Sequence, residues 1–237
     1  MCGLITQRIS PVDLQKTLNL FLEPAWNPSY LVRPTQPLLA VRAAPGGWRA
    51  DPLRWQLVPP WKRQISNSDN TWNAMGETVA EKPTFRNAFR SQRCLIPTAG
   101  FFEWEKIPIH KTRTYRQPWL IHSATPGLLV MAGLWERWQG VDGTCLESCT
   151  VITTTPNNFM QPLHHRMPVI LQPTDWAVWL DSASSPATLQ DLLRPCPDAW
   201  LDRYRVAADA LKDSDSPACL EPLQSPPDLG PRQMSLF

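Results

Sequence analysis

Short runs of β-branched and aromatic residues, broken by proline, glycine and asparagine, make up most of the chain. Such runs are typical of short strands, and their close spacing favours antiparallel pairing over βαβ units. We predict strands within residues 29–33, 38–44, 54–61, 94–105, 118–124, 128–138, 148–155 and 202–208. The pattern therefore predicts an α+β fold with many short, mainly antiparallel strands.

A few segments carry helical signals instead. Residues 10–22 begin with Ser10 as an N-cap, followed by a proline, an aspartate three residues on, and leucines at helical spacing. Further short helices are predicted at residues 84–93, 173–181 and 185–194, the last two capped by Thr174 and Ser185.

The periodic pattern stops near residue 211. Residues 212–232 are rich in proline, serine and aspartate and show no strand or helix period, so we predict a flexible tail. The organisation expected is one catalytic domain over residues 1–211, the tail, and a short terminal motif at residues 233–237.

Composition narrows the class of protein. Hydrophobic residues are 43% and charged residues 19% of the 237, as in a globular domain. The net charge of +2 argues against an avid, sequence-blind polyanion binder and leaves room for a local basic groove. The chain lacks a membrane-length apolar run and the hydrophobic region of a signal peptide, so we expect a soluble, cytoplasmic protein without membrane contact. We also expect a monomer.

The six cysteines form no CxxC pair and no cysteine–histidine spacing of a zinc site. We therefore expect no metal and no cofactor. Cys145 and Cys149 are close enough in sequence to face one another, but reduced thiols are the expected state in the cytosol.

The chain opens with MCGL, so trimming of Met1 would expose Cys2 as the first residue. An α-amine with a pKa of about 7.7 to 8 is partly neutral at physiological pH and can attack an aldehyde. The neighbouring thiolate can then add to the imine and close a thiazolidine ring. The alternative is a cysteine that merely begins a buried strand.

Three later segments bear on this choice. They are WNAMGET at residues 72–78, CLIPTAGFFEWE at residues 94–105 and HHRMPVIL at residues 164–171. In this order, after MCGL, they resemble the SOS-response-associated peptidase (SRAP) family, whose patterns run roughly CGR, NAR-ET, P-GFYEW and H-RMPV-L. The resemblance covers about residues 2 to 210 and implies a curved or barrel-like sheet core. It also implies that Cys2 crosslinks to abasic sites in single-stranded DNA.

The resemblance assigns the remaining chemistry to three residues. Asn73 would orient Cys2 or the ring-opened sugar, although from the residues alone an asparagine capping a turn is the simpler interpretation. Glu103, flanked by aromatics that raise its pKa, would protonate the sugar ring oxygen; the alternative is a solvated strand-face glutamate. His164 would transfer a proton, whereas a structural histidine is the alternative.

Candidate DNA contacts are less specific. Trp104 is a candidate platform for an unstacked base, against ordinary core packing. Arg166 is a candidate phosphate contact and Thr153 a weaker contact to the sugar. Arg86, Arg90 and Arg93 have spacings that can share a helical face and line a backbone groove, with a solvated helix face as the equal alternative.

Three positions depart from the family patterns. Leu4 replaces the arginine of CGR, Met75 replaces the arginine of NAR, and Leu31 replaces an asparagine in a YN-APTQ stretch. Two phosphate contacts are therefore missing or moved, with Arg8 and Arg33 as the replacements to consider.

The last five residues, QMSLF, resemble the Q-(L/M)-x-L-F peptide by which bacterial repair proteins bind the β sliding clamp. Gln233 would hydrogen-bond while Met234, Leu236 and Phe237 fill apolar pockets. The alternative is a disordered end with a hydrophobic stub.

Three functions follow. The first is covalent crosslinking to abasic sites, with strand cleavage by β-elimination as a lyase side activity of the imine. The second is a cysteine peptidase, with Cys2 as nucleophile, His164 as base and release of Met1 as its minimal activity. The third is a non-catalytic, clamp-associated DNA-binding adaptor.

Overall fold

The computed structural model describes residues 3–22, 26–110, 113–212 and 215–225. The strands are β1 Ile5–Thr6, β2 Phe21–Leu22, β3 Pro37–Ala44, β4 Gly47–Trp55, β5 Asn73–Met75, β6 Arg93–Thr98, β7 Gly100–His110, β8 Arg113–Ser123, β9 Leu129–Gln139, β10 Cys145–Thr154, β11 Met167–Pro168 and β12 Leu201–Arg205. The helices are α1 Pro11–Leu18, α2 Arg86–Ser91, α3 Pro173–Leu180 and α4 Pro186–Asp191, with the 3₁₀ turns η1 Asp198–Trp200, η2 Asp209–Leu211 and η3 Pro217–Leu220.

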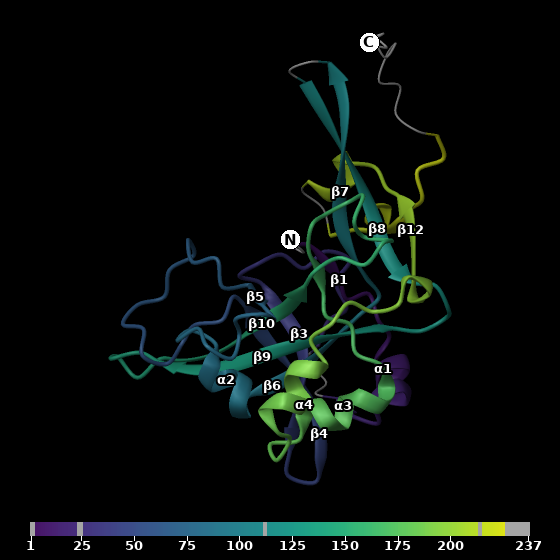
Figure 1. The fold of residues 1–237 in the computed structure, drawn as a ribbon. Coiled ribbons are helices and arrows are strands. Elements are labelled where there is room, and N and C mark those ends of the chain that lie inside the picture. The colour runs from purple at the N-terminus through teal and green to yellow at the C-terminus, as the bar shows by residue number, and fades with distance from the viewer. Residues whose placement is uncertain (1–2, 23–25, 111–112, 213–214, 226–237) are drawn as a thin grey trace.

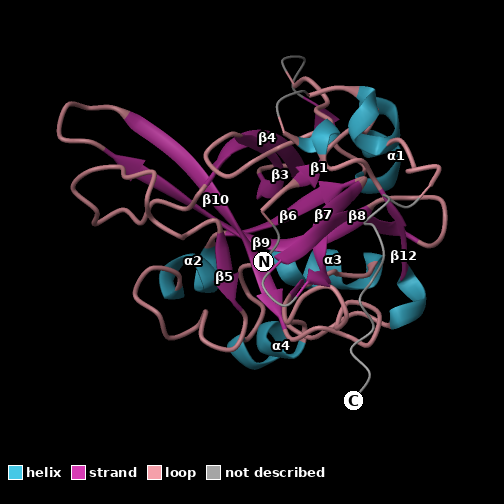
Figure 2. Cartoon of the chain, turned by 90° about the horizontal axis from the view of Figure 1, so that it is seen from above, coloured by secondary structure: helices cyan, strands magenta, loops and turns pink. Residues whose placement is uncertain are grey.

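Five strands close into a barrel. The order runs β10, β9, β6, β3 and β4 through antiparallel pairs, and a parallel pairing of β4 with β10 completes the ring. Strands β2, β5 and β11 extend this sheet. β2 pairs with β4 and β5 pairs with β10, both in parallel. The helices α2, α3 and α4 lie beside the barrel (Figures 1 and 2). The predicted fold of mainly antiparallel strands in a barrel-like core is confirmed.

A second, antiparallel sheet runs β1, β7, β8 and β12. Its long β7–β8 hairpin starts against the barrel and projects away from it, as Figure 1 shows. β1 pairs with the beginning of β7, where Ile5 lies opposite Phe101. The first strand of the chain is therefore fixed at the base of the hairpin.

Barrel strands bury both of their faces, and β3 shows why. Leu39 and Val41 point into one apolar cluster, which the helices α1, α3 and α4 complete, while Leu38 and Ala40 point into a second cluster shared with the other sheet. Successive side chains of a strand face opposite sides, so a continuous apolar run is required when both sides are covered. The run LLAV meets that requirement.

The helix caps agree with the sequence at two of three positions. Ser10 accepts the Asp13 amide at 3.0 Å, and Ser185 accepts the Thr188 amide at 3.1 Å. The prediction of Thr174 as a cap is wrong: α3 begins at Pro173, so Gln172 occupies the N-cap position. Proline favours the first helical position, which moves the helix start one residue earlier than the threonine indicated.

The segment at residues 29–33 does not form the predicted strand. Within it only an isolated bridge joins Val32 to Ile5. The proline at position 34 follows directly, and residues 34–36 turn. The extended segment at residues 29–33 therefore forms a single β-bridge and does not continue as a strand.

The described end of the chain packs against the domain instead of forming a flexible tail. Cys219 in η3 is fully buried, and its cluster contains Leu4, Leu31, Phe102 and Leu211. Proline and serine residues hide these few apolar anchors in the sequence, which is why composition indicated disorder over all of residues 212–232. Residues 226–237 lie outside the described residues.

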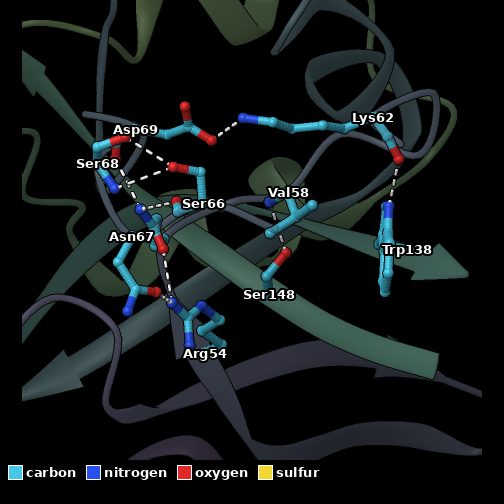
Figure 3. A network of polar contacts seen from close by, with 10 residues as sticks. Arg54, Val58, Lys62, Ser66, Asn67, Ser68, Asp69, Trp138 and Ser148 are labelled. Carbon is cyan, nitrogen blue, oxygen red and sulfur yellow. Dashed lines mark hydrogen bonds and ion pairs between the residues drawn. The ribbon is translucent and has the colours of Figure 1, made fainter. Parts of the chain in front are cut away.

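The connection between β4 and β5 is held by side chains of the barrel. Arg54 of β4 donates to Asn67 at 2.6 Å, Lys62 forms an ion pair with Asp69, and Trp138 of β9 donates to the Lys62 carbonyl at 2.6 Å (Figure 3). These contacts fix the loop although the Trp61 side chain is 61% exposed.

In the part of the chain described, no helix is long and apolar enough to cross a membrane.

Candidate active site

A pocket of about 500 Å³ lies between the start of the chain, the base of the β7–β8 hairpin and the turn before β11. Its lining residues are Gly3, Glu103, Trp104, Lys106, Arg116, Gln161, Pro162, Leu163, His164 and His165. Cys2, the predicted nucleophile, lies outside the described residues. Gly3, the first described residue, lines the pocket together with two members of the predicted chemical set.

Glu103 lies in β7 opposite Trp119 and is only 4% exposed. Burial raises the pKa of this carboxyl, and the opposing effects of the Trp104 amide and the Arg116 charge do not cancel it. The interpretation of Glu103 as a solvated strand-face residue is therefore wrong. A carboxyl with a raised pKa is suited to hold and return a proton near neutral pH.

His164 follows a turn in which its amide and that of Leu163 both bond the Met160 carbonyl. Its Nδ1 accepts the Arg166 amide at 3.0 Å, so in the neutral ring the proton is on Nε2. Burial lowers the pKa of His164 to about 4, and the neighbouring charges of His165 and Lys106 act in the same direction. At neutral pH the ring is therefore an uncharged N–H donor.

The ring of His165 stacks on that of His164, with centroids 4.3 Å apart and planes 25° from parallel. His165 itself is exposed at the pocket rim. His164 is therefore the inner imidazole of this pair and His165 the outer one.

Asn73 and Thr153 lie in the paired strands β5 and β10, and Arg166 is bonded to Thr153. Asn73 is buried in β5 opposite Val151 and is not among the residues that line the pocket. Arg166, 7% exposed, donates to both carboxylate oxygens of Glu77 at 2.7 and 2.8 Å and to the Thr153 carbonyl at 2.7 Å. The Thr153 hydroxyl donates to the Ala74 carbonyl at 3.2 Å. Glu77 is thus a partner that the sequence did not single out for the family arginine.

The predicted DNA contacts lie in different places. Trp104 lines the pocket, with the Arg116 guanidinium 5.9 Å from its ring centroid. Arg86 and Arg90 are exposed on α2. The prediction that Arg93 shares their exposed face is wrong. Arg93 begins β6, is 4% exposed, and donates to main-chain carbonyls that include those of Phe89 and Trp179.

Sequence reasoning missed the cations at the pocket rim. Lys106 and Arg116 lie opposite one another in the β7–β8 register and are both exposed. Their signal was the alternation of β7, which puts Phe102, Trp104 and Lys106 on one face.

Of the replacement arginines, Arg33 donates to the Leu211 carbonyl at 2.6 Å, and Arg8 lies 5.0 Å from the Tyr30 ring centroid. The clamp-binding residues Gln233, Met234, Leu236 and Phe237 lie outside the described residues.

Comparison with known proteins decides the family. Residues 1–212 match the family described as SOS response associated peptidase (SRAP). The chain belongs to the SRAP family. Among its SRAP relatives, the abasic site processing protein YoqW of Bacillus subtilis is 37% identical over 212 residues, which cover 88% of this chain and 93% of that protein. The abasic site processing protein HMCES of Mus musculus is 30% identical over 159 residues, covering 55% of this chain and 44% of that protein.

Solved structures share the SRAP fold. An X-ray structure of a protein from Bacteroides thetaiotaomicron superposes with a TM-score of 0.83 at 24% identity, covering 94% of this chain and 100% of the other. A protein from Bordetella bronchiseptica superposes with a TM-score of 0.76, covering 87% of this chain and 100% of the other. The SRAP match ends at residue 212, so the packed residues 215–225 lie beyond it.

Proposed function

We propose that this protein binds abasic sites in single-stranded DNA and becomes covalently attached to them through Cys2. The observation that carries the proposal is the pocket in which Gly3, next to Cys2 in the chain, meets a buried carboxyl with a raised pKa and a neutral histidine. The names of the relatives, abasic site processing proteins, support the same substrate.

The reaction needs only groups of this chain and the sugar. After removal of Met1, the Cys2 amine adds to the ring-opened aldehyde and loses water, which gives an imine. The Cys2 sulfur then forms a bond to the imine carbon while the nitrogen takes a proton, which closes a thiazolidine. No oxidant or reductant is required.

Glu103 and His164 would divide the proton transfers. Glu103, whose pKa burial raises, would protonate the ring oxygen of the closed sugar and so release the aldehyde. The neutral Nε2–H of His164 would donate to the sugar oxygen or to the water that leaves. Asn73, buried in β5, is proposed to position the reactants.

The DNA strand would be held by the pocket rim. Lys106, Arg116 and His165 would contact phosphates, and the face of Trp104 would receive an unstacked base. Arg86 and Arg90, exposed on α2, are proposed as more distant backbone contacts. Arg166 would act on the DNA only indirectly, since its guanidinium is buried and bonded to Glu77 and to the Thr153 carbonyl.

Intact-mass analysis tests the proposal. The purified protein is incubated with a single-stranded oligonucleotide that carries one abasic site. The expected product is a heat-stable adduct whose mass is that of the Met1-free protein plus the oligonucleotide minus one water. Absence of this adduct from wild-type protein whose Met1 has been removed would refute the proposal.

Two variants separate the alternatives. Cys2→Ser keeps the amine and is expected to leave a reversible, borohydride-trapped imine without a stable adduct. Acetylation of the Cys2 amine abolishes both products, whereas a thiol-dependent peptidase would survive it. An adduct that persists in Cys2→Ala would favour attachment through another nucleophile.

We further propose that Gln233, Met234, Leu236 and Phe237 bind the bacterial β sliding clamp as a short linear motif. The sequence QMSLF follows a proline-rich segment, a context that suits an accessible peptide. A fluorescent peptide of residues 226–237 is titrated with purified clamp, and the same peptide with alanine at the last two positions is the control. Equal affinity of both peptides would remove the proposal.

A further inference from the structure

We propose that residues 215–225, here named the C-terminal strap, hold the N-terminal residues in the reactive pocket and thereby set the rate of crosslinking. This inference rests on the proposed function, and it concerns a segment beyond the SRAP match. In Figure 1 the strap runs in yellow along β12 and the second sheet.

Asp215 provides the first anchor of the strap. Its Oδ1 accepts the amides of Tyr30 and Leu31 at 2.6 and 2.9 Å, and its Oδ2 accepts the Ser29 hydroxyl at 3.1 Å. A carboxylate that accepts successive backbone amides makes charge-assisted bonds, which are stronger than neutral ones. Asp215 therefore fixes the backbone of residues 29–31.

Further contacts hold the other end of the strap. The Leu223 amide donates to the Arg205 carbonyl at 2.8 Å, the Tyr204 hydroxyl donates to the Leu220 carbonyl at 2.7 Å, and Pro222 bridges Val206. The strap is thus bonded both to β12 and to residues 29–31, and it spans the distance between them.

Residues 29–31 lead directly to the start of the chain. Val32 and Ile5 exchange amide–carbonyl bonds at 3.1 and 2.8 Å, and the Leu4 carbonyl accepts the Phe102 amide at 3.0 Å. Leu4 is next to Gly3, which lines the pocket. The path from Asp215 to the pocket is therefore one continuous series of short hydrogen bonds and chain neighbours.

The same region contains two of the three departures from the family patterns. Leu4 and Leu31 replace polar residues of those patterns, and both are buried in one cluster with Phe102 and Cys219. Apolar side chains at these positions need a cover that excludes water. The strap supplies part of that cover through the fully buried Cys219.

Placement of the nucleophile matters because the reacting atoms must meet at about 3 to 3.5 Å, and a misplacement of about 1 Å can cost on the order of a hundredfold in rate. β1 is held on one side by β7 and on the other by residues 29–32. Loosening of residues 29–31 removes the second of these supports and would let Gly3 and the residues before it shift relative to Glu103. The rim residues proposed to contact DNA, Lys106, Arg116 and His165, lie outside the strap. The inference therefore predicts a slower reaction at unchanged DNA affinity.

The test compares single-turnover crosslinking by the full chain and its point variants. Asp215→Ala is expected to lower the rate at saturating abasic oligonucleotide about tenfold while the half-saturating concentration changes less than twofold. Asp215→Asn keeps an oxygen acceptor for the amides and is expected to recover the rate to within about threefold of wild type. Asp209→Ala, which removes an exposed carboxylate bonded to Lys212, is the matched control and should keep the wild-type rate.

Amide hydrogen exchange gives a readout that does not depend on crosslinking. In Asp215→Ala the amides of Ile5, Gln7 and Val32 should exchange at least tenfold faster than in wild type, while those of β9 stay unchanged. Unaltered exchange together with an unaltered rate would overturn the strap proposal. Faster exchange with no adduct from wild type would instead retain the strap contact and refute the proposed function.

Discussion

His164 should make the stability of the protein depend on pH. Its ring is held neutral by burial, with Nδ1 accepting the Arg166 amide. We consider His164→Gln, because the Gln side-chain oxygen can still accept that amide while the titratable group is gone. The variant should lose a pH-dependent part of the unfolding free energy and keep the local hydrogen bond.

The sign and size follow from the pKa values. The folded-state pKa of His164 is about 4 and its ordinary value is 6.5, so between these values the unfolded chain binds more protons. The stabilisation is fully present above pH 6.5 and is lost as the pH falls through 4. One pKa unit corresponds to about 1.4 kcal/mol, which gives an upper value of about 3 kcal/mol, and partial solvation of the ring reduces it to about 2 kcal/mol.

Urea unfolding at pH 4, 5, 6 and 7, followed by tryptophan fluorescence, measures the effect. The 12 tryptophans give a strong signal. Burial of Glu103 acts in the opposite direction, because a raised carboxyl pKa stabilises at low pH, but this contribution is common to both proteins. The difference between wild type and His164→Gln should therefore grow by about 2 kcal/mol from pH 4 to pH 7. His165→Gln, which removes the outer imidazole, is the control, and a constant difference between wild type and His164→Gln would refute the reasoning.

Three other changes should have measurable effects. Glu103→Gln should slow crosslinking about 10²- to 10³-fold with little loss of DNA affinity, because the buried acid is lost, and a rate within threefold of wild type would exclude that role. Glu77→Gln leaves the buried Arg166 guanidinium without its carboxylate and should lower the unfolding free energy by about 2 kcal/mol in chemical denaturation. Gly133→Ala places a methyl group 2.9 Å from the Cys94 sulfur and 3.0 Å from a main-chain carbonyl, so calorimetry should show a cost of about 1 to 3 kcal/mol, and an unchanged midpoint would argue that the barrel adjusts.

The sequence predicted those parts of the fold that depend on local periodicity. The apolar runs at residues 38–44 and 128–138 form barrel strands, because a strand that is buried on both faces needs apolar residues at successive positions. Closure of the barrel was not readable, since it depends on the parallel pairing of Ser148 with Arg54, residues far apart in sequence. A local pattern carries no information on such a pairing.

In the candidate site, too, some residues were predicted from local sequence and others were not. Glu103 and His164 were found through motif segments, and the structure brings both into one pocket with Gly3. The pairing of Arg166 with Glu77 was not found, because two charges 89 positions apart give no sequence signal. The exposure of Arg93 was predicted incorrectly because helical spacing was extended past the end of α2 at Ser91.

The strap also determines how far the end of the chain can travel from the reactive pocket. In the sequence, 21 residues at 212–232 separate the domain from QMSLF, but only seven of them, residues 226–232, follow the strap. Seven residues extend at most about 25 Å. If QMSLF binds a sliding clamp as proposed, the docked strap would keep the pocket within that distance of the clamp and would restrict which lesions along the DNA strand the pocket can contact.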